Sequence, residues 1–369
     1  MRIALVISAL GRGGAERQLM RLAFGLESLG EQVEVWCYGG ATELDDELRE
    51  KGIVVRNASG LRFGKIGILR RWVREFAPDI VHAFMKRASS LSVLARGIRR
   101  WPVIIGSDLS TATYGKRNMT LWISLFLFGF AQCVATQTEL NRLSLQRLAP
   151  WLRGKVKVIR NGLDLAKFTP ADSFPPEAPF RFIAVGSVYG LKNPIRLVDA
   201  IALLRDQGHT DFVVDWYGRY GLKGDHQPSD TYLECIRRIK VLNLGKVFRF
   251  RGETNEINAA YQDAHALIHP SIQEGFPNAV VEGMACALPI VVSRVSDLPL
   301  VVNEARNGYV FDETQPSSIA AGMSSMLATS RKKRAAMGRR SRELVESWFG
   351  QDRFVAEYRA LYSELLQAQ

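Results

Sequence analysis

The sequence predicts an α/β protein made of two Rossmann-like, doubly wound domains that face a cleft. Short β-branched runs alternate with amphipathic stretches along the chain, as in a parallel sheet covered on both faces. The alternation breaks once, at residues 168–179, where four prolines fall within twelve residues, and then restarts. With 369 residues in total, we expect domains at 1–168 and 180–347, a linker at 169–179, and a C-terminal helix at 348–369 that packs back on the first domain.

In the first domain, each strand is predicted by a short apolar run and each helix by apolar residues at helical spacing. The predicted strands are residues 3–9, 32–38, 53–56, 79–84, 103–106, 133–136 and 156–159. The predicted helices are residues 15–29, 66–76, 89–99 and 139–148. Residues 121–131 contain one serine among eleven residues, a run too short to span a bilayer. We expect a buried helix there; an interfacial segment that starts at Lys116 and Arg117 is the alternative.

The same pattern continues in the second domain. Its predicted strands are residues 182–185, 212–217, 247–250, 266–269, 290–292 and 309–311. Its predicted helices are residues 194–205, 232–242, 257–263, 279–285, 317–328 and 331–347, and a last helix is predicted at 353–367. Ligands of such sheets bind at the carboxyl ends of the strands, so we expect the site there.

The net charge of +12 lies entirely in the first half of the chain. Residues 1–168 hold 26 basic and 14 acidic side chains, whereas the remainder holds 23 of each. Residues 62–117 alone hold 12 basic and 3 acidic side chains. Such asymmetry favours a polyanionic partner, which could be an anionic membrane, nucleic acid or a phosphorylated substrate. A solvated basic face is the alternative.

Cysteine usage argues against a disulfide framework and against a zinc site. The four cysteines (Cys37, Cys133, Cys235 and Cys286) are far apart and form no Cys-x-x-Cys pair. A reducing compartment fits, and no targeting segment is evident. We therefore expect a cytoplasmic protein.

A glycine-rich turn, Gly-Arg-Gly-Gly-Ala-Glu at residues 11–16, joins the first predicted strand to the first predicted helix. Gly13 and Gly14 would let a ligand approach the backbone at the helix N-terminus. The turn lacks the spacing of a dinucleotide fingerprint, so a nicotinamide site is disfavoured. A tight strand–helix turn without a ligand is equally compatible with this motif taken alone.

The most informative segment is residues 269–291, in which Glu274 and Glu282 are separated by seven residues. Glu274 is expected on the loop after a strand and Glu282 inside the helix that begins near Asn278. Paired carboxylates suit a ribose or sugar diol, and a helix N-terminus suits a diphosphate. Two solvated glutamates on a loop are the alternative from spacing alone.

With its order and spacing of motifs, the chain resembles the retaining glycosyltransferases of family 4, which have the GT-B fold. Besides the glutamate pair, the resemblance rests on Gly13–Glu16, on Pro-Asp-Ile-Val-His at 78–82, on Val-Ile-Arg-Asn-Gly-Leu-Asp at 158–164 followed by Phe168 and Pro170, and on Asn-Gly-Tyr at 307–309. The resemblance implies that Glu282 binds the nucleotide ribose and that Glu274 approaches the donor sugar. The implied catalytic residues are Glu274, Lys192 and Asp108. The implied donor-binding residues are Gly186, Ser187, Lys192, Gly218, Arg219, Arg251, Glu274, Gly275, Phe276, Pro277, Asn278 and Glu282. The implied acceptor-side residues are Gly13, Gly14, His82 and Asp108.

Three positions depart from the family pattern. Ser187 stands where an arginine of the diphosphate clamp is usual, which leaves Lys192 with the helix dipole or with Arg219. Asp108 stands near the position of a histidine, and Leu300 stands where glutamate is frequent. These departures motivate an alternative, a non-catalytic scaffold or membrane-binding module.

The resemblance implies a metal-independent transferase that moves a sugar from a nucleotide-diphosphate donor, with UDP as the default nucleotide, to a polysaccharide, lipid-linked or glycolipid acceptor. No Asp-x-Asp triplet occurs in the sequence, so no metal cofactor is expected. The basic segment, including Arg62, Lys65, Arg70, Arg71 and Arg74, is expected to contact anionic lipid at the inner face of the cytoplasmic membrane. Nucleic acid is not expected, because residues 62–117 carry few aromatics and no recognition motif. A phosphorylase or epimerase of the same fold is a further possibility.

Overall fold

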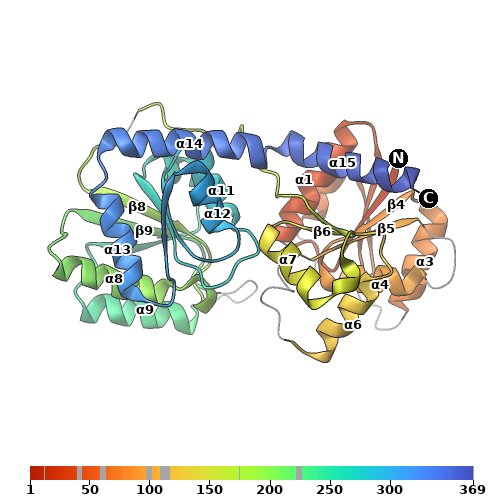
Figure 1. Cartoon of the computed structure of the whole chain (residues 1–369), viewed down its shortest axis with the longest axis horizontal. Coiled ribbons are helices and arrows are strands. Elements are labelled where there is room, and N and C mark those ends of the chain that lie inside the picture. Colours follow the sequence, from red (N-terminus) through yellow and green to blue (C-terminus); the bar gives the residue numbers. More distant parts are fainter. Residues whose placement is uncertain are drawn as a thin grey trace. The chain divides into compact units, whose positions relative to one another are not determined.

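The computed structural model describes residues 1–11, 13–39, 44–58, 64–96, 102–108, 117–173, 175–221 and 227–368, which form two compact units (Figure 1). Unit 1 comprises Met1–Gly162 and Gly350–Gln369, and unit 2 comprises Leu163–Phe349. Each unit contains one parallel sheet with helices packed on it, which confirms the α/β fold with two Rossmann-like domains.

Unit 1 is built on a seven-stranded sheet with the order β3-β2-β1-β4-β5-β6-β7. The strands are β1 (Arg2–Ile7), β2 (Gln32–Cys37), β3 (Val54–Asn57), β4 (Ile80–Ala83), β5 (Val103–Ser107), β6 (Cys133–Thr136) and β7 (Val156–Val158). Alternate residues of β1 belong to different cores: Ile3 and Leu5 pack into one cluster, Ala4 and Val6 into another. This two-sided burial explains the uninterrupted apolar run in the sequence.

The helices of unit 1 are α1 (Gly14–Ser28), α2 (Asp45–Glu50), α3 (Lys65–Phe76), α4 (Met85–Arg96), α6 (Met119–Phe128), α7 (Glu139–Leu148) and α15 (Gln351–Gln367). Although α15 ends the chain, Figure 1 shows it beside α1, and its side chains Phe354, Val355 and Tyr358 join the core around β1. Gln18 and Arg21 of α1 both donate to the carbonyl of Gly162, where the chain leaves the unit.

The prediction that residues 121–131 form a buried helix is wrong for half of that helix. Leu121, Leu125 and Phe128 of α6 are buried, but Ile123 and Phe126 are 53% and 61% exposed. Because the segment is apolar on every side, its sequence does not indicate which face of the helix packs against the core.

Unit 2 is built on a six-stranded sheet with the order β10-β9-β8-β11-β12-β13. The strands are β8 (Phe180–Val185), β9 (Phe212–Tyr217), β10 (Phe248–Gly252), β11 (Ala266–His269), β12 (Ile290–Ser293) and β13 (Gly308–Phe311). The helices are α8 (Pro194–Asp206), α9 (Asp230–Val241), α10 (Ile257–Gln262), α11 (Asn278–Ala285), α12 (Leu298–Ala305), α13 (Pro316–Leu327) and α14 (Arg331–Phe349). Two cores enclose the sheet: Ala266 and Ile268 of β11 face one, and Leu267 faces the other.

The proline-rich segment does not lie at the junction of the units, because the chain passes between them at Gly162–Leu163 and at Phe349–Gly350. Its backbone is held by unit 2. The N–H of Thr169 donates to the side chain of Asn258, and Gln262 donates to the carbonyl of Thr169. Glu177 pairs with Arg334 of α14. The described part of this segment is therefore a loop that packs on unit 2.

The four cysteines are buried and form no disulfide with one another. Among the described residues, no helix is long and apolar enough to cross a bilayer.

Candidate functional site

The carboxyl edge of the unit 2 sheet has a topological switch point between β8 and β11, which are neighbours in the sheet although the chain leaves them toward opposite sides. Loops that follow two such strands diverge and leave a crevice, the usual place for a ligand in this class of sheet. The glycine-lysine loop follows β8 and the loop of Glu274 follows β11. The expected donor residues of unit 2 thus gather at one edge.

Two glycines allow the loops after β8 and β9 to touch. Gly186 has φ of 153° and Gly218 has φ of 141°, a region that other residues rarely adopt. A Cβ on Gly218 would lie 2.2 Å from the carbonyl oxygen of Gly186. The same oxygen accepts a hydrogen bond from Trp216 Nε1 at 2.7 Å. The close approach of the two backbones therefore fixes the loop after β8 against the loop after β9.

Asn193 ties the loop after β8 to its neighbours. It has a left-handed backbone, with φ of 61°, immediately before α8. Its side-chain amide donates to the carbonyl of Pro270 at 3.0 Å and to that of Glu313 at 2.8 Å. The N–H of Ile272 also donates to the carbonyl of Leu191 at 2.8 Å. Lys192, within the short 3₁₀ turn Gly190–Lys192, is thereby held at the crevice.

Lys192, Glu274 and His269 form a charged cluster. Lys192 Nζ donates to Glu274 Oε1 at 2.5 Å, and His269 Nε2 lies 3.1 Å from the same oxygen. The side chain of Glu274 is 12% exposed and that of Lys192 is 18% exposed. A carboxylate at this depth needs a cation, and Lys192 supplies it.

The titration of the cluster follows from this geometry. Burial raises the pKa of Glu274, but Lys192 and His269 outweigh that effect and hold the pKa at about 2. Burial lowers the pKa of His269 below 6.5, so its ring is neutral at pH 7 and donates from Nε2. The cluster at neutral pH therefore consists of an ammonium, a carboxylate and a neutral imidazole.

Glu282 lies one turn inside α11 and is nearly buried. Tyr261 donates to its Oε2 at 3.1 Å, and burial together with this carboxylate raises the pKa of Tyr261 well above 10. Before it, the ring of Phe276 packs against Phe349, with centroids 5.1 Å apart, so that only the backbone of Phe276 is left for a ligand. Pro277 occupies the N-cap position of α11, and Asn278 is the first residue of the helix.

The loop of Glu274 is also fixed by Ser296, whose hydroxyl donates to the carbonyl of Gly275. Ser187, at the position of the missing arginine, is half-buried in the loop after β8. Along the chain, Ser187 directly follows Gly186 and precedes the turn that contains Lys192.

The two arginines expected in the donor site have carboxylate partners. Arg219 pairs with Glu253 at 2.9 Å. Arg251 pairs with Asp215 at 2.7 Å, and Arg249 binds the same carboxylate. The structure brings neither arginine onto Glu274, so Lys192 is the cation of the cluster.

Sequence reasoning missed His269, Asn193, Ser296 and Asp215. His269 had a readable signal, because it ends a predicted strand five residues before Glu274. Asn193 and Ser296 act through partners far along the chain, which spacing alone does not reveal.

In unit 1, Gly13 is the N-cap of α1 and Gly14 is its first residue. Arg17 donates from its N–H to the carbonyl of Gly13 at 3.2 Å. Because β1 and β4 are neighbours whose connections run to opposite sides of the sheet, the turn after β1 lies at a switch point, where a ligand loop is expected.

His82 is a core residue, which corrects its expected acceptor contact. It is fully buried, with Nδ1 2.8 Å from the hydroxyl of Tyr362 and Nε2 2.8 Å from that of Ser107. Burial lowers the pKa of His82 to about 3. Both ring nitrogens are occupied by protein groups, so His82 positions Ser107 and α15 instead of meeting a ligand.

Asp108 follows β5 and is also buried. Asn141 donates to the backbone carbonyl of Asp108 at 2.7 Å and lies 3.5 Å from its Oδ1. Asp108 is therefore held at the end of β5 by Asn141, and its contact with an acceptor stays a prediction. Of the basic segment, Arg62 and Lys116 lie outside the described residues.

Comparison with known proteins assigns the family. Residues 167–344 match the family model described as Glycosyl transferases group 1, and residues 12–167 match the one described as Glycosyltransferase Family 4. Over 230 residues the chain is 28% identical to D-inositol 3-phosphate glycosyltransferase of Streptomyces avermitilis. The aligned region covers 58% of this chain and 48% of that protein. The chain thus matches about half the length of that relative.

A second relative is matched more fully. Over 293 residues, and 77% of each chain, the identity is 25% to the Campylobacter jejuni α-1,4-N-acetyl-D-galactosaminyltransferase named for a lipid-linked acceptor, GalNAc-α-(1→4)-GalNAc-α-(1→3)-diNAcBac-PP-undecaprenol. The fold is similar to that of Anabaena HepE, solved with UDP, with a TM-score of 0.87 at 18% identity over 99% of this chain and 100% of that one. The chain therefore belongs to the family 4 (group 1) glycosyltransferases.

Proposed function

We propose that the protein is a retaining, metal-independent glycosyltransferase that moves a sugar from a UDP-sugar to a polysaccharide, lipid-linked or glycolipid acceptor. The observation that carries this proposal is the cluster of Lys192, Glu274 and His269 at the switch point of the unit 2 sheet. A diphosphate and a sugar diol are the chemical groups that an ammonium and an ionised carboxylate in one crevice bind together.

Each residue of the cluster has a distinct task. The ammonium of Lys192 has three donors, of which Glu274 takes one, so the others can bind the diphosphate and stabilise the charge that develops as it leaves. Glu274 stays ionised and accepts hydrogen bonds from hydroxyls of the donor sugar. Glu282 accepts hydrogen bonds from the ribose, and the N-terminus of α11 favours the negative charge of the diphosphate.

In the proposed retaining reaction, the acceptor hydroxyl attacks the donor sugar from the face that the nucleotide leaves. An oxygen of the β-phosphate takes the proton of that hydroxyl, and the bond between the sugar and the diphosphate breaks on the same face. This route suits a site whose near-buried carboxylate, Glu274, is neutralised by Lys192 and is therefore a poor nucleophile.

The relatives support the substrate classes. HepE has been solved with UDP and glucose, and the Campylobacter relative is named for an undecaprenol-diphosphate acceptor. We take UDP as the nucleotide and a lipid-linked or polysaccharide chain as the acceptor.

Nucleotide binding is the first measurement. At about 100 times its dissociation constant, UDP should stabilise the protein by about 2.7 kcal/mol, in the presence of EDTA, and GDP, ADP and CMP should not. Glu282→Ala should lose the shift, because the ribose loses its carboxylate. Glu304→Ala, which removes an exposed carboxylate from α12, is the control and should keep it. No shift with any nucleotide would favour the non-catalytic scaffold, and a shift that requires a divalent cation would contradict metal independence.

Stereochemistry is tested once a donor is known. The product should carry the anomeric configuration of the donor sugar, read from the coupling of its anomeric proton by NMR. The opposite anomer as first product would show an inverting reaction and would require a protein base in place of the β-phosphate.

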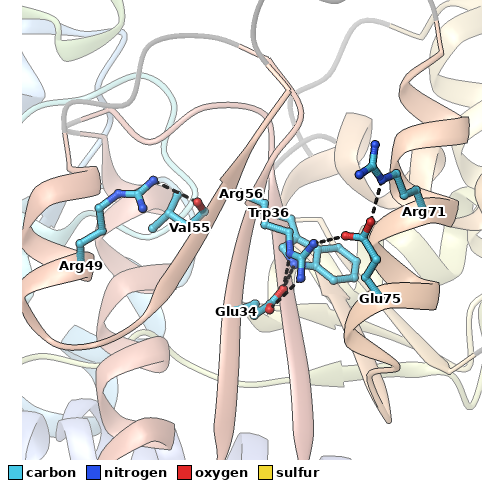
Figure 2. A network of polar contacts seen from close by, with 7 residues as sticks. All are labelled: Glu34, Trp36, Arg49, Val55, Arg56, Arg71 and Glu75. Carbon is cyan, nitrogen blue, oxygen red and sulfur yellow. Dashed lines mark hydrogen bonds and ion pairs between the residues drawn. The ribbon is translucent and has the colours of Figure 1, made fainter.

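We also propose that the basic segment 62–117 approaches an anionic surface at the inner face of the cytoplasmic membrane. Part of its charge is compensated within unit 1. Figure 2 shows Arg71 directed at Glu75, which also pairs with Arg56 of β3. Arg70 donates to the carbonyl of Ala95. Interactions between exposed charges are weak and are screened by salt. Attachment to an anionic surface through this segment alone would therefore be sensitive to salt.

A further inference from the structure

The outer face of α6 is apolar and exposed. Met119, Trp122, Ile123 and Phe126 recur at helical spacing, and Phe130 continues the row just beyond the helix. These five residues, here the α6 face, are each more than 40% exposed. A contiguous row of large apolar side chains in water marks a surface that is covered by something else.

The row is held rigidly in this orientation. The side chain of Asn118 caps α6 by accepting from the N–H of Leu121 at 3.0 Å. Leu121, Leu125 and Phe128 on the inner face are packed in a core with β6 and α7. The helix therefore has its own packed side, and the exposed row is a second, unpartnered side.

Aromatic residues dominate the far end of the face. The rings of Phe126 and Phe130 make an edge-to-face contact, with centroids 5.3 Å apart. Trp151, half exposed, lies against Gly129 and donates from Nε1 to the carbonyl of Leu125 at 3.2 Å. Tryptophan and phenylalanine are the residues that prefer the boundary between lipid headgroups and acyl chains.

Three basic residues, Arg96, Arg117 and Lys155, lie next to the face or just before it. In the sequence, residues 109–163 hold eight basic side chains and one acidic side chain. Two of the basic residues are paired, Arg142 with Glu139 and Lys157 with Glu364. Arg96 donates to the carbonyl of Phe130 at 2.8 Å, and Lys155 donates to that of Gly129 at 2.7 Å. Arg117 is exposed two residues before the face begins. An apolar row within a basic field is complementary to an anionic lipid surface.

We propose that the α6 face inserts into the headgroup–acyl boundary of an anionic membrane, with Arg96, Arg117 and Lys155 at the level of the headgroups. A second copy of the chain fits the face less well, because a symmetric contact would bring the same cations together. The attachment does not depend on the proposed transferase activity, since it needs no donor.

Vesicle co-sedimentation of the full chain tests the proposal. Wild type should bind vesicles of equal parts phosphatidylcholine and phosphatidylglycerol, and a measurable part of the binding should persist at about 1 M NaCl, where charge attraction is screened within about 3 Å. Met119→Ser/Phe126→Ser should weaken binding about tenfold or more, because it removes the two most exposed large apolar side chains of the helix. Leu233→Ser/Val241→Ser, on α9 of unit 2, removes similar exposed apolar groups and should bind as wild type does.

Two further arms separate the sources of binding. Arg71→Glu/Arg74→Glu on α3 should reduce binding only at low salt, because the α6 face remains. Brominated lipid should quench tryptophan fluorescence when the face inserts. Trp151→Phe should keep this quenching, whereas Trp122→Phe should lose most of it. Wild-type binding by the α6 double variant, or complete release of wild type at high salt, would overturn the proposal. So would a lipid-free dimer that the α6 double variant dissociates in analytical ultracentrifugation, since the face would then be a contact between copies.

Discussion

Replacing Lys192 with alanine is expected to lower kcat by about 10²–10³-fold, because the leaving diphosphate loses the cation that would stabilise it. No other cation is in contact with Glu274 among the described residues. Arg219, in the loop after β9, is paired with Glu253, and Arg251, on β10, is paired with Asp215. The loss should appear in single-turnover transfer from the donor, and it should exceed the effect on nucleotide affinity.

The same substitution should change the pH profile. In the wild type, the pKa of Glu274 is about 2, so its carboxylate is ionised at mildly acidic pH as well as at neutral pH. Without Lys192, burial still raises the pKa of Glu274, and His269 alone opposes it. Activity of Lys192→Ala should therefore fall on acidification over a range in which the wild type is flat.

Controls must separate catalysis from folding, since an uncompensated buried carboxylate also destabilises unit 2. Lys192→Ala/Glu274→Gln removes the charge together with its partner and should recover stability without recovering activity. Lys246→Ala, at an exposed position of unit 2, should change neither. A kcat for Lys192→Ala within about twofold of wild type would place the chemistry away from this cluster.

Much of the fold could be predicted because burial on both sheet faces leaves a periodic trace in the sequence. β6, β9 and β11 begin and end at the expected residues. Two helices left no such trace. The sequence of α2 is almost entirely polar, and that of α12 is apolar over most of its turns, so neither shows a one-sided pattern.

The proline-rich segment shows a different limit. Prolines indicate where regular structure stops, but they do not indicate what the segment packs against. Its partners Asn258, Gln262 and Arg334 are about 90 to 160 residues away along the chain. A linker was therefore a reasonable prediction from composition, although the described residues of the segment belong to unit 2.

For the site, spacing located Glu274 and Glu282 but not their partners. His269 is five residues from Glu274, whereas Lys192 is 82 residues away and meets it only because β8 and β11 are neighbours. His82 and Asp108 show the reverse case. Both lie in segments that match the family, yet their burial depends on Tyr362 and Asn141, from distant elements.

Gly218→Ala is expected to destabilise unit 2 by about 2–4 kcal/mol and to abolish the stabilisation by UDP. The added Cβ would lie 2.2 Å from the carbonyl oxygen and 2.6 Å from the carbonyl carbon of Gly186, and backbone atoms cannot turn aside as a side chain can. The φ of 141° at Gly218 adds strain for any residue with a Cβ. Relief requires the loop after β8 to move, and that loop carries Lys192.

Gly190→Ala is the matched comparison, because Gly190 begins the turn that contains Lys192 and has no left-handed φ. Its Cβ would meet only the hydroxyl of Thr231, at 4.0 Å, so its stability should stay within about 0.5 kcal/mol of wild type. Denaturant unfolding with and without UDP measures both quantities in both variants. If Gly218→Ala unfolded like Gly190→Ala and still bound UDP, the contact between the loops after β8 and β9 would not shape the nucleotide site. If Gly218→Ala alone lost both, loop contact and nucleotide binding would be parts of one structure, with Lys192 aligned by the close approach of two backbones.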